Sequence, residues 1–232
     1  MSLIPCSCAF LATIRNAVLA AVGIVVLLSS AGTAQAQVCA LPGSEGDATI
    51  AGTVNTYWTP AGGSYSGNGS IALSSQRGAT TTLAEGDLVL VIQMQCANIN
   101  ANDSLNYGDG AGGEPASGYS DPATGCLAGR YQFVRAGAGS SNAILNLTGS
   151  PLTAAYEQAN ATATAGRRTF QVIRVPQYAN LTLGGTVTAV EWNGDSGGIV
   201  VLDAAFTLNL GAGINVDGLG FRVGAGRSRS VS

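Results

Sequence analysis

Apolar and polar residues alternate most regularly near the end of the chain, in Gly197–Phe221. In the FTLNL segment at 206–210 the three apolar residues lie on one side of an extended chain and the two polar residues on the other. After the glycine-rich break at 211–213, the same rhythm returns in INVD at 214–217. Two short strands around a glycine corner predict the opening coil of a parallel β-helix, in which each layer buries its inward face against the next layer.

The same pattern predicts strands through most of the preceding chain. The strongest is Leu88–Gln95, with leucines and Ile92 on one face and valines that give way to glutamines on the other. This strand should be buried on both faces at its start and on one face at its end. The alanine-rich segment Leu152–Ala163 predicts the one helix. Further strands are expected at 49–58, 70–74, 80–83, 131–135, 143–147, 170–175, 181–183 and 187–192.

These elements predict an all-β fold. We expect a β-sandwich or barrel-like body over about 48–192, which runs into the first rung of a parallel β-helix at 197–221 and an irregular tail at 222–232. Residues 37–232 should form a single β-rich domain, because a chain of this length is long enough to bury a core.

Residues 1–36 have the features of a secretory signal peptide. Arg15 supplies a positive charge, an apolar run follows at 17–28, and the A-x-A sequence at 34–36 predicts cleavage between Ala36 and Gln37. The run is short for a membrane span. The chain is therefore expected to be secreted or on the cell surface. The alternative is an uncleaved membrane anchor formed by residues 17–30.

Five cysteines are present, and Cys6 and Cys8 would leave with the signal peptide. Cys96 and Cys126 flank a loop rich in glycine, asparagine and aspartate, so we expect a disulfide between them. In the chain-entropy model, closing this loop contributes roughly 3 kcal/mol. Cys39 is then a free thiol near the new N-terminus, or it pairs with one of the other two. Three scattered cysteines without histidine do not suggest a metal site.

Composition narrows the classes of partner. Only 10% of residues are charged, the net charge is −3, and the chain has no histidine; its basic residues are all arginine. A weakly acidic chain of this kind has no electrostatic footprint for nucleic acid. The loop at 97–125 is the one segment with many hard oxygen donors for Ca²⁺, but they lack EF-hand spacing and a solvated loop is favoured. The weak calcium candidates are Asp103, Asp109, Glu114 and Asp121, and no other cofactor is expected.

The segment Gly194–Gly198 reads GDSGG, as around the nucleophilic serine of chymotrypsin-like proteases. That chemistry needs a histidine base, and a serine-lysine variant needs lysine; the chain has neither. We therefore interpret the motif as a glycine-rich turn in which Asp195 and Ser196 hydrogen-bond the local backbone. The nucleotide-binding glycine fingerprints are also absent.

Carbohydrate chemistry is the alternative function. Paired carboxylates can hydrolyse glycosides without histidine, and parallel β-helices host such enzymes. The candidates are Asp195, Asp203 and Asp217, although nothing in the pattern brings them together, and a turn cap or a solvent-facing strand residue is the simpler interpretation. Trp58 and Trp192 could stack on sugar rings, but in a β-rich chain they are expected in the core.

Four phrases follow one another in order along the chain: GDLVLVIQMQ at 86–95, YGDG at 107–110, FQVIRVPQY at 170–178 and WNGDSGGIVVLDAAFTLNLGAGINVDGLGF at 192–221. Together they resemble the N-terminal region of large bacterial exported surface proteins that continue into repeated DUF11-type modules, some of them similar to gliding-motility-associated surface proteins. The resemblance implies a cell-envelope or extracellular location, a structural or adhesive role, and no catalytic residues.

The chain departs from these proteins after Phe221, where their glycine-rich segments would continue. We therefore expect a truncated, non-catalytic surface protein. Its partners would be cell-envelope or extracellular surfaces, including polysaccharide. An unpaired rung edge would favour self-association, and the membrane would be contacted only through an uncleaved signal peptide.

Overall fold

The computed structural model describes residues 41–98, 125–162 and 165–221 of the 232-residue chain. Within these ranges the protein is all-β, as predicted, with eleven strands and no helix. None of the described segments forms a helix that is long and apolar enough to cross a membrane. The described residues all belong to one compact unit.

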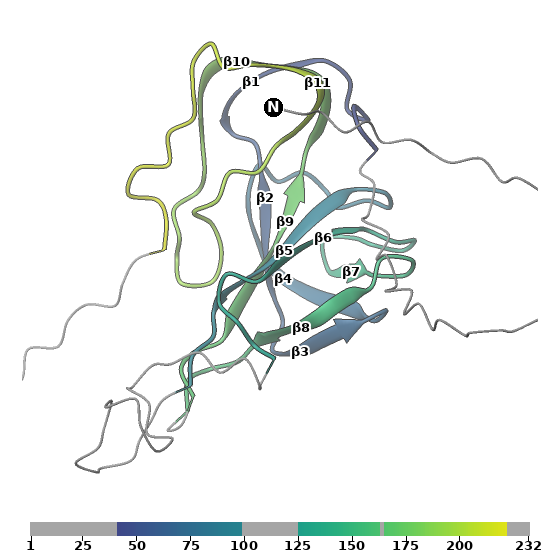
Figure 1. The fold of residues 1–232 in the computed structure, drawn as a ribbon, viewed down its shortest axis with the longest axis vertical. Coiled ribbons are helices and arrows are strands. Elements are labelled where there is room, and N and C mark those ends of the chain that lie inside the picture. Colours follow the sequence, from purple (N-terminus) through teal and green to yellow (C-terminus); the bar gives the residue numbers. More distant parts are fainter. Residues whose placement is uncertain (1–40, 99–124, 163–164, 222–232) are drawn as a thin grey trace, which may run out of the picture. The chain divides into compact units, whose positions relative to one another are not determined.

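The largest element is a six-stranded antiparallel sheet (Figure 1). Its central strands are rich in β-branched and aromatic residues, which favour the extended backbone. Across the sheet the strands are β6 (Tyr131–Arg135), β5 (Leu88–Gln95), β9 (Thr169–Val175), β2 (Thr56–Pro60), β4 (Ser70–Gly78) and β7 (Ile144–Asn146).

A second, two-stranded sheet pairs β3 (Gly63–Gly67) with β8 (Leu152–Gln158). The helix predicted for Leu152–Ala163 is therefore wrong: its first half is the strand β8. Leu152 and Tyr156 are buried and pair with Gly67 and Tyr65 of β3, so strand pairing and burial override the helical propensity of the alanines.

The third sheet is parallel and has the order β1 (Ala48–Thr53), β10 (Gln177–Thr188) and β11 (Asp203–Asn209). Figure 1 shows these three strands running together. The parallel part thus includes two strands that the pattern had assigned to the body.

The chain passes between the sheets at two corners. Only Val54 and Asn55 separate β1 from β2, so the strand expected at 49–58 is two strands in different sheets. Pro176 alone separates β9 from β10; since proline has no N–H to donate, the antiparallel ladder stops there. Strand β10 then ends at Thr188, so the strand expected at 187–192 is not formed beyond that residue.

Strand β5 is buried on both faces, as predicted. Val89 and Val91 lie in a core cluster with Trp58, whereas Leu88 and Leu90 lie in a second cluster on the opposite face. The face that carries the glutamines was expected to be exposed at the end of the strand. It is not fully exposed, because Gln93 is also buried.

The segment expected to be a strand at 80–83 is irregular. Thr80 has a φ of 57°, in the left-handed region that β-branched residues rarely adopt. Side chains satisfy the backbone N–H groups that follow this bend. The N–H of Thr81 donates to Oγ1 of Thr56, and the N–H of Leu83 donates to Oδ1 of Asn142.

Candidate functional site

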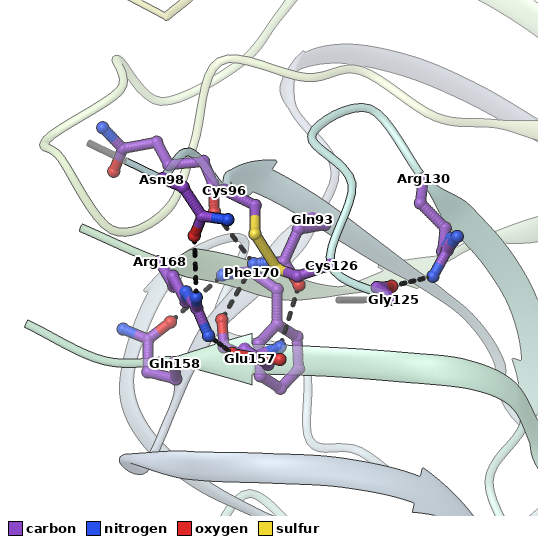
Figure 2. Close-up of a disulfide and its surroundings, with 11 residues drawn as sticks. Gln93, Cys96, Asn98, Gly125, Cys126, Arg130, Glu157, Gln158, Arg168 and Phe170 are labelled. Carbon is purple, nitrogen blue, oxygen red and sulfur yellow. Dashed lines mark hydrogen bonds and ion pairs between the residues drawn. A yellow bond between two sulfur atoms is a disulfide. The ribbon is translucent and has the colours of Figure 1, made fainter. Parts of the chain in front are cut away.

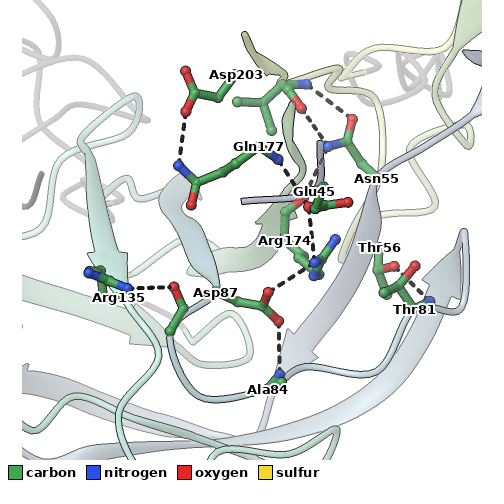
Figure 3. Close-up of polar contacts among 12 residues, drawn as sticks. Glu45, Asn55, Thr56, Thr81, Ala84, Asp87, Arg135, Arg174, Gln177 and Asp203 are labelled. Atoms are coloured by element: carbon green, nitrogen blue, oxygen red, sulfur yellow. Dashed lines mark hydrogen bonds and ion pairs between the residues drawn. The ribbon is translucent and has the colours of Figure 1, made fainter. Parts of the chain in front are cut away.

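The junction between the antiparallel and parallel sheets is held by a charged cluster (Figure 3). Arg174, at the end of β9, lies 2.9 Å from Asp87 and 3.1 Å from Glu45. Burial by itself lowers the pKa of Arg174, but the hydrogen bonds and charges of Asp87 and Glu45 outweigh it and raise the pKa above its usual value. The guanidinium therefore stays charged and ties the segment before β1 to the large sheet.

Glu45 also binds the first residue of β10. Its carboxylate accepts a hydrogen bond from the N–H of Gln177 at 3.0 Å, and the Gln177 side chain donates to Asp203 of β11 at 2.9 Å. Asp203, a sequence candidate for carbohydrate chemistry, is thus a structural partner of β10 (Figure 3).

The segment at 189–202, which connects β10 to β11, crosses the large sheet without joining it as a strand. Instead, buried side chains of the sheet and of the short link before β2 bind its backbone at alternate residues. Gln171 forms two hydrogen bonds with Gly197, the Tyr57 hydroxyl donates to the carbonyl of Ile199 at 2.5 Å, and Asn55 binds Val201. We call this segment the crossover.

Asn55 has a special place among these side chains because it binds both the crossover and β9. Its amide group donates to the carbonyls of Val201 at 2.7 Å and Arg174 at 3.1 Å, and its carbonyl accepts from the N–H of Val201 at 3.1 Å. The side chain is fully buried. Asn55 therefore replaces, in part, the backbone ladder that the crossover lacks.

The GDSGG segment is a turn in the crossover, as interpreted from the sequence, and is buried at Ser196 and Gly197. The expected hydrogen bonds are wrong in detail. Asn193 caps the turn: its side-chain carbonyl accepts from the N–H groups of both Asp195 and Ser196 at 3.0 Å. The Asp195 carboxylate pairs with Arg167. The Ser196 side chain is 0% exposed and its hydroxyl has no hydrogen-bond partner among the described residues, so it is not presented to a substrate.

The glycines of this turn are required by close packing. A Cβ at Gly197, which has a φ of 107°, would lie 2.5 Å from the carbonyl oxygen of Glu191. Arg77 completes the turn by donating to the carbonyls of Glu191 at 3.1 Å and Ser196 at 2.8 Å. These contacts account for the motif by packing and hydrogen bonding.

The parallel strands stack residues of like character in register. Leu181 of β10 is paired with Ala48 of β1 on one side and with Leu208 of β11 on the other. Farther along, Val187 is bridged to Ile214. Paired residues of a parallel sheet point to the same face, so the side chains form columns across the three layers.

The middle layer of these columns is buried and the last layer is open. Leu181, Leu183 and Val187 are each at most 1% exposed. In the β11 layer Leu208 is 48% and Leu210 is 59% exposed. The other exposed large apolar residues of this part of the chain are Phe206, at 80%, and Ile214, Val216 and Phe221.

A repeat in the sequence accompanies this stacking. Leu181, Leu183 and Val187 recur, 27 residues later, as Leu208, Leu210 and Ile214, and a glycine follows the second leucine in each copy. A Cβ at Gly184 or Gly185 would collide with side chains of β1, at the point where the pairing of β1 with β10 shifts register. This 27-residue spacing is the sequence signal that relates the parallel neighbours β10 and β11.

The disulfide between Cys96 and Cys126 is formed as predicted, with Cα atoms 5.9 Å apart (Figure 2). Polar side chains surround it: Arg168 pairs with Glu157 and donates to Asn98 at 3.2 Å. Gln93 holds the same region through hydrogen bonds with the backbone of Glu157. These contacts link Asn98, close to the disulfide, through Arg168 to Glu157 of β8.

Several predicted sites lie outside the described residues. They are the cleavage site at Ala36 and Gln37, Cys39, the alternative anchor at 17–30, and the calcium candidates Asp103, Asp109, Glu114 and Asp121. Among the residues that the structure does describe, no group of three or more histidine, cysteine, aspartate or glutamate side chains could hold a metal ion.

The three aspartates proposed for carbohydrate chemistry each contact different residues. Asp195 is paired with Arg167, Asp203 is bound by Gln177, and Asp217 lies in an exposed turn where its N–H donates to Asn215. Trp58 and Trp192 are 0% and 7% exposed, in agreement with the expectation that both are core residues. They are therefore not available as stacking platforms.

Sequence reasoning missed the side chains that hold the crossover. Asn55 and Gln171 stand inside strand-like apolar runs, and a polar residue at such a position signals a buried hydrogen-bonding role. The exposed aromatic pair Tyr131 and Phe133 on the edge strand β6 was also missed.

No protein-family model, curated protein or solved structure matches this chain.

Proposed function

We propose that this chain is a non-catalytic exported protein of the cell surface with a structural or adhesive role. In this proposal the antiparallel body carries the opening coils of a parallel β-helix, and the last coil presents an apolar layer for attachment. The observation that carries the proposal is the exposed β11 layer in register with the buried β10 layer.

The coil geometry supports the β-helix assignment. Three strands run parallel, the connection from β10 to β11 is a crossover without a helix, and Val187 and Ile214 continue the pairing beyond the glycine corner. Ordinary parallel sheets use helical crossovers, whereas solenoids stack coils of similar length directly. The 27-residue spacing between equivalent leucines is such a coil length.

The composition of the open layer supports an attachment role. Contiguous exposed apolar side chains on a soluble domain mark surfaces that bind another protein or a membrane. Phe206 and Leu208 of β11 and Leu210, just after the strand, are exposed, and none of the residues at 204–216 is charged. The attachment would therefore be driven by apolar burial and strand pairing.

The polar residues support a role without catalysis. Ser196 is buried, and the carboxylates of Asp195 and Asp203 are bound by side chains of the fold. The carbohydrate alternative has little support from the exposed aromatic pair, because the rings of Tyr131 and Phe133 stand at 82° to each other and do not form a flat platform for a sugar.

The proposal is tested by expressing the full chain with a C-terminal tag in a bacterium, separating medium, cell envelope and cytoplasm, and measuring the intact mass. We expect a species that begins at Gln37 and is held in the envelope or on the surface. A full-length species in the inner membrane would contradict the cleaved signal peptide, and a cytoplasmic chain would contradict export.

The attachment role is tested with paired variants of β11. Replacing Leu208 and Leu210 by glutamine should release the exported chain into the medium. The matched control replaces Thr207 and Asn209, exposed on the opposite face of the same strand, by glutamine, and should leave the chain in the envelope. Equal retention of both variants would contradict the role of the apolar layer.

A further inference from the structure

Among the strands that the structure describes, the outer side of β11 is an unpaired edge, and it carries exposed apolar side chains. We propose that a second copy of this chain covers it, with the two β11 strands antiparallel about a twofold axis at Leu208. This inference rests on the proposed attachment role of the layer and names its partner as a second copy, so the form of the chain held in the envelope would be the dimer.

The stacking of the layers indicates what kind of partner fits. On its inner side β11 pairs with β10 through Asn180, Leu181 and Thr182, and there Leu181 is fully buried between strands. The outer side of β11 offers the same kind of backbone edge, but Leu208 above it is half exposed. A strand with alternating apolar residues would complete the column, as strand addition does at other open edges.

The sequence of β11 is itself such a strand, and its pattern is symmetric about Leu208. With β11, which ends at Asn209, extended by one residue to Leu210, the antiparallel register centred there places Leu208 opposite Leu208 of the second copy and Phe206 opposite Leu210. On the other face, Thr207 lies opposite Asn209. All three exposed apolar side chains thus obtain apolar partners and the two polar residues obtain each other. A closed twofold contact of this kind uses the same surface in both copies.

Nothing in the charge pattern opposes this pairing. Proteins commonly protect open edges with lysine, other inward-pointing charges or proline, and none of these occurs between 204 and 216. The nearest acid, Asp203, would face Gly213 of the second copy and is already bound by Gln177. Like charges are therefore kept apart across the contact.

The other edge of the parallel sheet is a poorer partner. This edge is strand β1, whose apolar residues Ala48 and Ile50 are already partly buried against the side chains of β10. Pairing β11 with β1 of another copy would leave Phe206 and Leu210 with smaller or already buried neighbours. The twofold contact matches more exposed apolar surface and closes without forming a fibre.

The register is tested by disulfide cross-linking of the full chain purified from an exporting bacterium, in a background with Cys6, Cys8 and Cys39 replaced by serine. Leu208→Cys should form a covalent dimer under mild oxidation, because the two thiols face each other across the axis. Thr207→Cys is the matched control on the opposite face. Phe206→Cys and Leu210→Cys should cross-link when mixed, and each should cross-link far less alone.

The affinity is tested by sedimentation of the chain over a range of concentrations. Leu208→Arg would place two like charges at the axis and should weaken dimerisation at least about tenfold. Thr207→Arg, with Asn209 opposite, should weaken it much less. Leu208 is half exposed in the single chain, so its replacement should leave the near-ultraviolet circular dichroism unchanged.

A strictly monomeric chain, or cross-linking that is equal at 207 and 208, would overturn the twofold contact. Cross-linking of Phe206→Cys alone would indicate a parallel arrangement and would also overturn it. A monomer that is still exported and held in the envelope would leave the proposed function intact, whereas a dimer confined to the cytoplasm would overturn the proposed function alone.

Discussion

The buried amide of Asn55 offers the sharpest test of how the crossover is held. Asn55→Ala removes three hydrogen bonds, two to the carbonyls of Val201 and Arg174 and one from the N–H of Val201. Each buried backbone group left without a partner costs about 1 to 3 kcal/mol. Because these bonds are partly buried, the lower end applies, and the expected loss is about 3 kcal/mol in the free energy of unfolding.

The assay is urea denaturation. With a slope of about 2 kcal/mol/M, a loss of this size lowers the midpoint by about 1.5 M without a change of slope. Asn215→Ala is the matched control, because Asn215 accepts a similar backbone hydrogen bond, from Asp217, in an exposed turn. This control should lose less than about 1 kcal/mol, in the usual range for surface residues.

Asn55→Asp separates the hydrogen bonds from the size of the side chain. The introduced carboxyl can still accept from the N–H of Val201, but its ionised form faces the carbonyls of Val201 and Arg174 without a donor. Burial should raise the pKa of this carboxyl in the folded state, so the variant should lose stability as pH rises through that pKa. The reasoning would be refuted if Asn55→Ala were no more destabilising than Asn215→Ala.

Three further predictions concern the turn, the disulfide and the buried tyrosines. Gly197→Ala should lower the free energy of unfolding, measured by heat or urea, several times more than Gly213→Ala, for which roughly 1 kcal/mol is expected. Both glycines have positive φ, but only Gly197 lacks space for a Cβ. Equal losses would contradict this. Replacing Cys96 and Cys126 together by serine should cost roughly 3 to 4 kcal/mol in urea unfolding, from the 30-residue separation, and an unchanged midpoint would contradict it. Burial raises the pKa of Tyr156 to about 12 and also raises the pKa of Tyr57. The free energy of unfolding should therefore keep its full tyrosine contribution below about pH 10 and fall as pH rises above it, because only the unfolded chain ionises there. The check is phenolate absorbance of the folded protein, and titration of all seven tyrosines near pH 10 would contradict the prediction.

Local pattern was sufficient where a strand is buried in the ordinary way. Strand β5 was located with both ends correct because alternating leucines and valines fill two cores on its two faces. The disulfide could also be predicted, since the two cysteines flank one polar loop. The missing histidine and lysine were enough to interpret GDSGG as a turn, and the packing of Ser196 and Gly197 gives the physical reason for its composition.

Local pattern failed where neighbours far along the chain decide the outcome. The alanines of β8 favour a helix in isolation, but pairing of Tyr156 with Tyr65 of β3 fixes an extended backbone. The strand expected at 49–58 is divided because Asn55 turns the chain and binds residues 119 and 146 positions away. No window of a few residues contains these partners.

The amino-acid sequence by itself determined the strand-rich class, the disulfide and the lack of a histidine or lysine base, because these depend on composition and on spacing within single segments. Only the tertiary structure decided that β1 and β10 belong to the parallel stack and that Leu208 lies in an open layer above buried Leu181. The physical reason is that a strand's two edges and two faces acquire their meaning from the segments packed beside them, which sequence alternation alone does not specify.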